Sequence, residues 1–169
     1  STEYKVRISA SEVIAPYFIA RHLPKLRTLF PELEVTLTVT NQSPSKMLEE
    51  FDISLWPSTP SNEDMFGRKL TEVRWALFGT AQTPKDPANQ HREELEQDVV
   101  GIAGRNRDGD VVPRTLKRSS RHLTSTNSLI TAASIAVATN CYAYLPCILG
   151  CNYHGLVQVG PSEDHKIGA

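Results

Sequence analysis

The sequence lacks the features that define several large classes of protein. Its 169 residues carry a formal net charge of −1, without the basic excess normal for a domain that grips nucleic acid by itself. No hydrophobic run approaches the ~20 residues of a membrane-spanning helix, and no basic, apolar signal peptide opens the chain. The sequence therefore predicts a cytoplasmic protein with no membrane contact and no DNA-binding surface of its own.

Cysteine is scarce and confined to one region. Cys141, Cys147 and Cys151 form no evenly spaced disulfide framework, which favours a reducing compartment. Cys147, Cys151 and His154 could be imagined as a metal or redox cluster, but a structural zinc site needs four ligands and no second pair is visible. Partly buried free thiols are the preferred interpretation, with no metal and no cofactor.

Motifs of the common enzyme classes are also absent. The glycine-rich segment 101–109 lacks the Gly-Lys-Ser/Thr of a phosphate loop, and neither Gly-x-Ser-x-Gly nor His-Glu-x-x-His occurs. We therefore predict no catalytic residues and no enzymatic activity. A basic cluster without interleaved aromatics is interpreted as a solvated face or subunit contact; its members are Arg114, Lys117, Arg118, Arg121 and His122.

What the sequence does contain is an alternation of strand and helix patterns. Apolar and polar residues alternate over 5–9 and 34–40, which predicts two strands, and apolar spacings of three and four predict a helix over 13–30. A short helix over 43–50 and a short strand over 51–55 follow. Two such βα units and a third strand predict parallel pairing with right-handed crossovers.

The second half repeats this order after a polar, proline-containing segment near residues 80–90. We predict an α/β protein of two lobes, residues 1–79 and 80–155, each a mostly parallel sheet flanked by helices, with 156–169 returning to the first lobe. The expected elements of the second half are a helix over 89–96, strands over 99–103 and 122–125, a helix over 127–139 capped by Ser125 or Thr126, a strand over 142–145, a short helix from Pro146 and a strand over 156–159.

Several short motifs occur in an order that is more specific than any one of them. They are Val6 to Ser11, Leu23-Pro24-Lys25-Leu26, Phe30 to Val35, Phe51 to Leu55, Gly67 to Leu70, Thr124 to Leu129, Ala143-Tyr144-Leu145-Pro146 and Gly155 to Val159. In this order the chain resembles the effector-binding domain of LysR-type transcriptional regulators. The resemblance covers nearly all of the chain.

This resemblance implies a two-lobed fold like that of type 2 periplasmic binding proteins, with a small-molecule effector, expected to be a metabolite, held between the lobes. It implies a homodimer or tetramer that binds DNA only through an N-terminal winged helix-turn-helix, which this sequence does not contain. The strand and helix that close the first lobe in the family are not found before Ala169. We also predict that helix 13–30 packs antiparallel to helix 127–139 of a partner. The alternative is a solute receptor of a transport system with the same fold, against which the missing signal peptide argues.

Candidate effector-binding residues follow the predicted strands, because ligands of open α/β sheets bind beyond the carboxyl ends of the strands. Ser11 could instead only cap the next helix, Asn41 could only form a turn, and Trp56 could only pack. Arg105 could clamp a carboxylate or lie in solvent, whereas Glu12 would favour a cationic or hydroxyl-bearing effector. The predicted set is Ser11, Glu12, Thr40, Asn41 and Trp56 in the first lobe, and Gly104, Arg105, Asn106, Ser125, Thr126 and Asn127 in the second, where helix amides could bind an anion.

Overall fold

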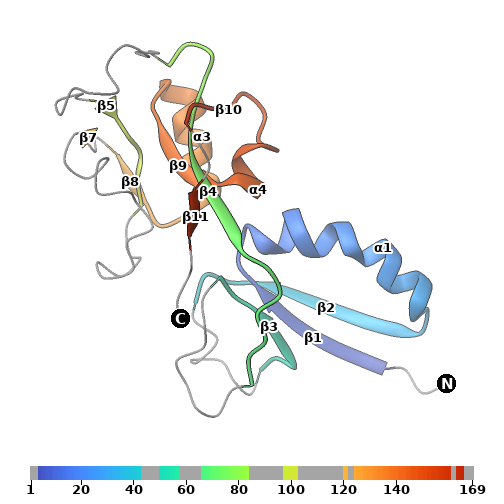
Figure 1. Cartoon of the computed structure of the whole chain (residues 1–169). Helices are drawn as coiled ribbons and strands as arrows, with labels where there is room; N and C mark the ends of the chain where they lie inside the picture. Colours follow the sequence, from blue (N-terminus) through green and yellow to red (C-terminus); the bar gives the residue numbers. More distant parts are fainter. Residues whose placement is uncertain are drawn as a thin grey trace. The chain divides into compact units, whose positions relative to one another are not determined.

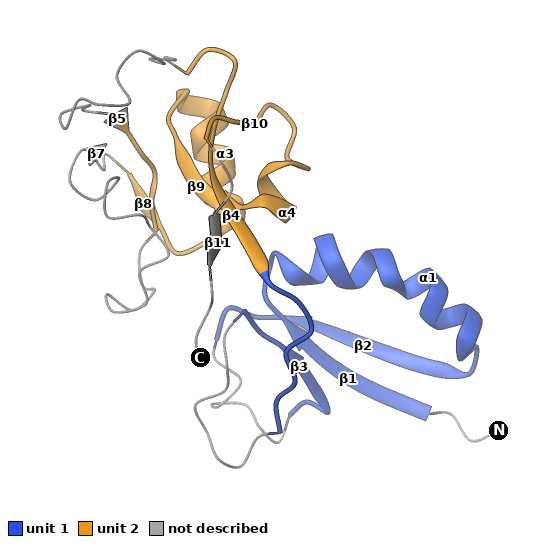
Figure 2. Cartoon of the chain, in the orientation of Figure 1, with its two compact units in different colours: residues 1–72, 166–169 blue, residues 73–165 orange. Residues whose placement is uncertain are grey.

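The structure, a computed structural model, describes residues 4–42, 50–57, 66–83, 97–102, 120–121, 124–160 and 163–165 (Figure 1). The chain divides into two units, residues 1–72 with 166–169 and residues 73–165 (Figure 2). The division falls before strand β4 (Val73–Gly79), not after it as predicted. The reason is that β4 hydrogen-bonds with strands of the second unit.

The first unit is built on a three-stranded parallel sheet of order β2-β1-β3. Strand β1 (Tyr4–Ala10) lies between β2 (Leu33–Val39) and β3 (Ile53–Leu55). The alternating residues predicted both long strands, and the βα order correctly predicted their parallel pairing. The predicted helix over 43–50 lies almost wholly outside the described residues.

One continuous helix was predicted over 13–30, but the structure has two consecutive helical segments. A π-helical turn, η1 (Ala15–Ile19), carries Pro16 at its start and leads into α1 (Ala20–Leu29). Helix α1 continues through Pro24, which has no N–H to donate to the preceding turn. None of the residues of α1 is fully buried. The buried core of this unit comprises Ile8, Ala10, Ala15 and Ile19.

The second unit is organised around β4, which pairs antiparallel with three strands. These are β9 (Ala143–Pro146), β10 (Val157–Gln158) and β11 (Glu163–His165). This sheet differs from the mostly parallel one that we predicted, because residue alternation identifies a strand without fixing the direction of its partner. Of the segment 156–169 that we predicted to return to the first lobe, β10 and β11 pair with β4, whereas residues 166–169 are grouped with the first unit.

Two further strand pairs in the second unit are parallel. Strand β5 (Gln97–Asp98) pairs with β7 (Ser120–Arg121), and β6 (Gly101–Ile102) pairs with β8 (Ser125–Thr126). The strand predicted over 99–103 is therefore shorter in the described residues, with Val99 forming an isolated bridge to Tyr142. The helix predicted over 89–96 lies outside the described residues.

Helices α3 (Leu129–Thr139) and α4 (Cys147–Gly150) contribute to the core of the second unit. Helix α3 buries Leu129, Ala132, Ala133 and Ala136, whose spacings of three and four place them on one face. The largest fully buried side chains of the described residues are Phe78, Leu145 and Leu149, which come from β4, β9 and α4. Within the described parts of the chain, no helix is both long enough and apolar enough to cross a membrane.

Candidate functional site

The carboxyl ends of the three strands in the first unit meet at one edge of the sheet. Ala10 of β1 is the register partner of both Val39 in β2 and Leu55 in β3. The residues that follow these three partners are Ser11, Thr40 and Trp56, all predicted effector-binding residues. The parallel register therefore places residues that are as many as 45 positions apart in the sequence at the same edge of the sheet.

Hydrogen bonds join the loops after β1 and β2 at this edge. The backbone N–H of Glu12 donates to Asn41 Oδ1 over 3.4 Å, and the N–H of Thr40 donates to the carbonyl of Ala10 over 2.9 Å. Thr40 Oγ1 also accepts from the N–H of Gln42 over 3.1 Å. Asn41 and Thr40 thus have structural roles in fixing the two loops. Contact of either residue with an effector stays a prediction.

Ser11 has the capping role that we considered as its alternative. Its Oγ accepts from the N–H of Ile14 over 3.3 Å, and its carbonyl accepts from the N–H of Ala15 over 2.9 Å. The residue is 4% exposed, so its hydroxyl is largely committed to the chain turn before η1. Any ligand at this edge would meet a serine that is already fixed in position.

Two serines outside our predicted set pair across the neighbouring strands. Ser9 of β1 and Ser54 of β3 are register partners, and their Oγ atoms lie 2.7 Å apart in a hydrogen bond. Ser9 is buried and Ser54 is half-buried. Each is the second-to-last residue of its strand. The alternation of side chains along the two strands could therefore have indicated that both serines face the same side of the sheet.

A bidentate ion pair between Arg7 and Asp52 lies away from the carboxyl ends of the strands. Arg7 donates from Nη2 and Nε to the two carboxylate oxygens of Asp52, over 3.0 and 3.3 Å, and its N–H donates to the same carboxylate over 2.8 Å. The hydrogen bond between the side chains raises the pKa of Arg7 and lowers that of Asp52. Asp52 precedes β3, so this pair ties β1 to the start of β3.

The second unit places part of the predicted residue set at the end of a strand pair. Ser125 and Thr126 form β8, whose register partners are Gly101 and Ile102, and Asn127 follows directly. The predicted capping by Ser125 or Thr126 is wrong, because both residues are held in β8. Ser128 caps α3 instead, its Oγ accepting from the N–H of Thr131 over 3.0 Å. Gly104, Arg105 and Asn106 lie outside the described residues.

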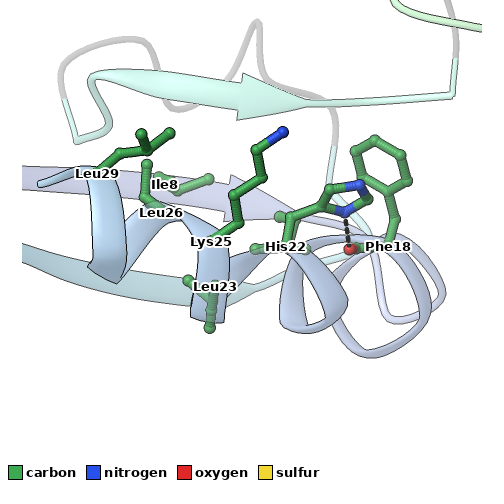
Figure 3. A pocket seen from close by; sticks show the side chains of 8 residues that line it. Ile8, Phe18, His22, Leu23, Lys25, Leu26 and Leu29 are labelled. Atoms are coloured by element: carbon green, nitrogen blue, oxygen red, sulfur yellow. Dashed lines mark hydrogen bonds between the residues drawn. The ribbon is translucent and has the colours of Figure 1, made fainter.

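An apolar groove of about 250 Å³ runs along α1 in the first unit, and none of our predicted residues lines it. Figure 3 shows Lys25, Leu26 and Leu29 extending from α1 to the same side, with the Nδ1 of His22 hydrogen-bonded over 2.8 Å to the carbonyl of Phe18. Ile8 of β1, Ile19 and Leu23 complete its lining. The groove has almost no polar surface that could orient a polar ligand.

All three cysteines are free thiols, as predicted. Cys141 and Cys147 are half-buried, and Cys151 is exposed. Among the described residues, no group of three or more histidine, cysteine, aspartate or glutamate side chains is placed to hold a metal ion.

Comparison with known proteins gives the family. The model of the LysR substrate binding domain matches residues 1–167, so the chain belongs to this family and is a regulatory domain of the LysR type. This family assignment favours the regulator over the transport receptor. No curated protein matches the sequence.

Solved structures show the same fold at low sequence identity. The regulatory domain of CrgA from Neisseria meningitidis has a TM-score of 0.74 and 11% identity, over 96% of this chain and 86% of that one. The effector domain of AmpR from Pseudomonas aeruginosa has a TM-score of 0.72 and 8% identity, over 95% of this chain and 81% of that one. The regulatory domain of CcmR from Synechocystis, solved in complex with 2-PG, has a TM-score of 0.69 and 14% identity, over 92% of this chain and 79% of that one. These likenesses support the predicted two-lobed fold class.

Proposed function

We propose that this chain senses a small-molecule effector without converting it, and that the first unit contributes the loops after β1, β2 and β3 to the binding site. The observation that carries the proposal is the common register of Ala10, Val39 and Leu55, which gathers Ser11, Thr40 and Trp56 at one edge. Ligands of open α/β sheets bind at such an edge. The family assignment and the CcmR domain in complex with 2-PG support an effector-binding role.

The side chains at this edge suit a ligand with hydrogen-bonding groups and a flat or apolar part. Half-buried Thr40 supplies a hydroxyl, and half-buried Trp56 supplies an aromatic surface on which such a part could pack. Glu12 adds negative charge, which favours a cationic or hydroxyl-bearing group in this half of the site. The contribution of the second unit, at Gly104 to Asn106 and Ser125 to Asn127, stays part of the proposal.

Ligand-dependent thermal stability tests this function. A library of metabolites would be screened for compounds that raise the melting temperature, because a ligand at 100 times its Kd stabilises the fold by about 2.7 kcal/mol. For a hit, Thr40→Val should weaken binding at least tenfold, whereas Thr36→Val, a matched change on the exposed side of β2, should leave it unchanged. Recovery of the ligand unaltered after long incubation is expected.

Two results would contradict the proposal. A ligand that is chemically changed by the protein would indicate an enzyme. Equal effects of Thr40→Val and Thr36→Val on the Kd would place the ligand elsewhere than at the strand ends.

We further propose that the complete regulator is cytoplasmic, binds DNA through a separate N-terminal domain and assembles as a homodimer or tetramer. Exposed apolar residues around the end of α1 support self-association, since Leu29 and Phe30 are 61% and 55% exposed. Light scattering at increasing protein concentration tests this assembly, and a monomer at the highest concentration would contradict it.

A further inference from the structure

Two of the three free thiols lie one helical turn apart. Cys147 is the first residue of α4 and Cys151 follows its last, with the N–H of Cys151 donating to the carbonyl of Cys147 over 3.0 Å. Residues four positions apart on a helix project from the same face. Cys151 is exposed and Cys147 is half-buried, so neither residue is enclosed in the core.

We propose that Cys147 and Cys151 together form a binding site for one Cu(I) ion, coordinated by two thiolates. Such a site needs no third protein ligand, which agrees with the absence of any three-residue ligand group among the described residues. Zinc would need four ligands in a structural site. Soft thiolates favour both Cu(I) and zinc, so it is the number of ligands, two, that favours Cu(I) here. The argument that counted against zinc therefore does not apply to this ion.

The helical spacing suits a bridging ion better than a direct disulfide. Cβ atoms four residues apart on a helix are about 5–6 Å apart, whereas a disulfide requires about 3.5–4.5 Å. An ion bound in line between two sulfurs spans about 4.6 Å if each bond is as long as the ~2.3 Å of a zinc–thiolate bond. Such a span fits the spacing without movement of the backbone.

Charge and packing around α4 support the same assignment. Arg74 of β4 lies near Cys147, and this positive charge offsets the negative charge of a Cu(I) ion bound by two thiolates. Binding of Cu(I) to the two thiols releases their protons. The copper remains Cu(I) throughout, because each sulfur exchanges a proton for the metal without any change of oxidation state.

The far side of α4 is anchored in the core of the second unit. Leu149 is fully buried, and Gly150 packs directly against the ring of Phe78. The two thiols are therefore presented by a helical turn whose position is fixed by β4. Preorganisation of this kind lowers the entropy lost on metal binding.

Anaerobic titration of the reduced chain with Cu(I), in competition with a chromophoric Cu(I) chelator, tests the site. We expect one tightly held ion per chain. Loss of a residue that only hydrogen-bonds to a metal ligand already weakens metal sites by about 10–100-fold, so loss of a ligand in Cys151→Ser should weaken binding at least ~100-fold. Cys141→Ser is the matched control and should leave the affinity unchanged, since Cys141 lies between α3 and β9 and not on the helical turn that carries Cys147 and Cys151. Circular dichroism verifies that each variant is folded, and Cys147→Ser provides the second ligand test.

The proposal is overturned if the wild-type chain fails to compete with the chelator. It is also overturned if Cys151→Ser and Cys147→Ser bind as tightly as wild type, or if Cys141→Ser weakens binding as much as they do. Formation of a Cys147–Cys151 disulfide on mild oxidation with peroxide, together with no Cu(I) binding by the reduced protein, would show that the pair serves redox chemistry instead. None of these outcomes depends on the effector.

Discussion

Gly150 occupies a place where the core of the second unit has no room for one more carbon atom. A Cβ added at Gly150 would clash with Cε2 and Cζ of Phe78 and would lie only 2.6 Å from Cδ2. The ring of Phe78 is fully buried, so it cannot swing into solvent to relieve the contact. Gly150→Ala should therefore destabilise the second unit.

The magnitude follows from two opposing effects. Forcing an extra methyl group into a packed core typically costs about 1–3 kcal/mol, and three contacts far below van der Waals distance place this site in the upper part of that range. Alanine gains up to about 1 kcal/mol over glycine inside a helix, but Gly150 is the last residue of a four-residue helix, where the gain is smaller. We expect a net loss of about 1–2 kcal/mol in the free energy of unfolding.

Urea denaturation followed by tryptophan fluorescence measures this loss. Trp75 lies in β4 and is 3% exposed, so its emission reports on the second unit, and Trp56→Phe removes the only other tryptophan. In this background, Gly150→Ala should lower the urea midpoint and reduce the melting temperature by about 2–4 °C per kcal/mol.

Gly160→Ala is the matched control, because nothing lies within 4 Å of the Cβ it would add. A smaller side chain at position 78 should relieve the clash. Phe78→Leu and Gly150→Ala together should therefore lower the free energy of unfolding by less than the sum of the two single changes. If Gly150→Ala proved as stable as wild type, or if the two changes were simply additive, the close packing of α4 on β4 would be refuted.

Two further predictions follow from single hydrogen-bonding groups. Ser128→Ala removes the side-chain cap that accepts from the N–H of Thr131, and urea denaturation should show a loss of about 0.5–2 kcal/mol in the free energy of unfolding. Ser128→Asn should retain most of the stability, because asparagine also caps helices. Equal losses for both variants would contradict the capping role. In the folded chain the hydrogen bond from Arg7 lowers the pKa of Asp52 below its ordinary value of 3.8, so its stabilising contribution is present above that pH and is lost as pH falls through the lowered value. NMR titration of the Asp52 carboxyl in wild type and in Arg7→Gln measures this shift, and an unchanged pKa in the variant would contradict it.

Local residue patterns predicted much of the first unit because its elements are formed by neighbours in the sequence. The alternation in β1 and β2 reflects one buried face in each strand, and the Ala-rich pattern of α3 in the second unit likewise reflects one buried helix face. The π-helical turn at Ala15–Ile19 could not be anticipated, since it differs from an α-helix by one residue per turn and leaves the apolar spacing nearly unchanged. The cap at Ser128 was missed because Ser125, Thr126 and Asn127 directly precede it and are also common capping residues. Only the pairing of Ser125 and Thr126 in β8 shows that the helix begins after them.

For the candidate site, the sequence by itself determined that polar residues follow each strand of the first unit and that the chain has the family's order of motifs. Only the tertiary structure decided that Ser11, Thr40 and Trp56 lie at the same edge of the sheet, because their positions depend on the register of β1 with β2 and β3. It also decided that β4 belongs to the second unit and pairs antiparallel, through hydrogen bonds to strands more than 60 residues later. Such long-range pairings depend on how the whole chain folds back, which no local pattern of side chains encodes.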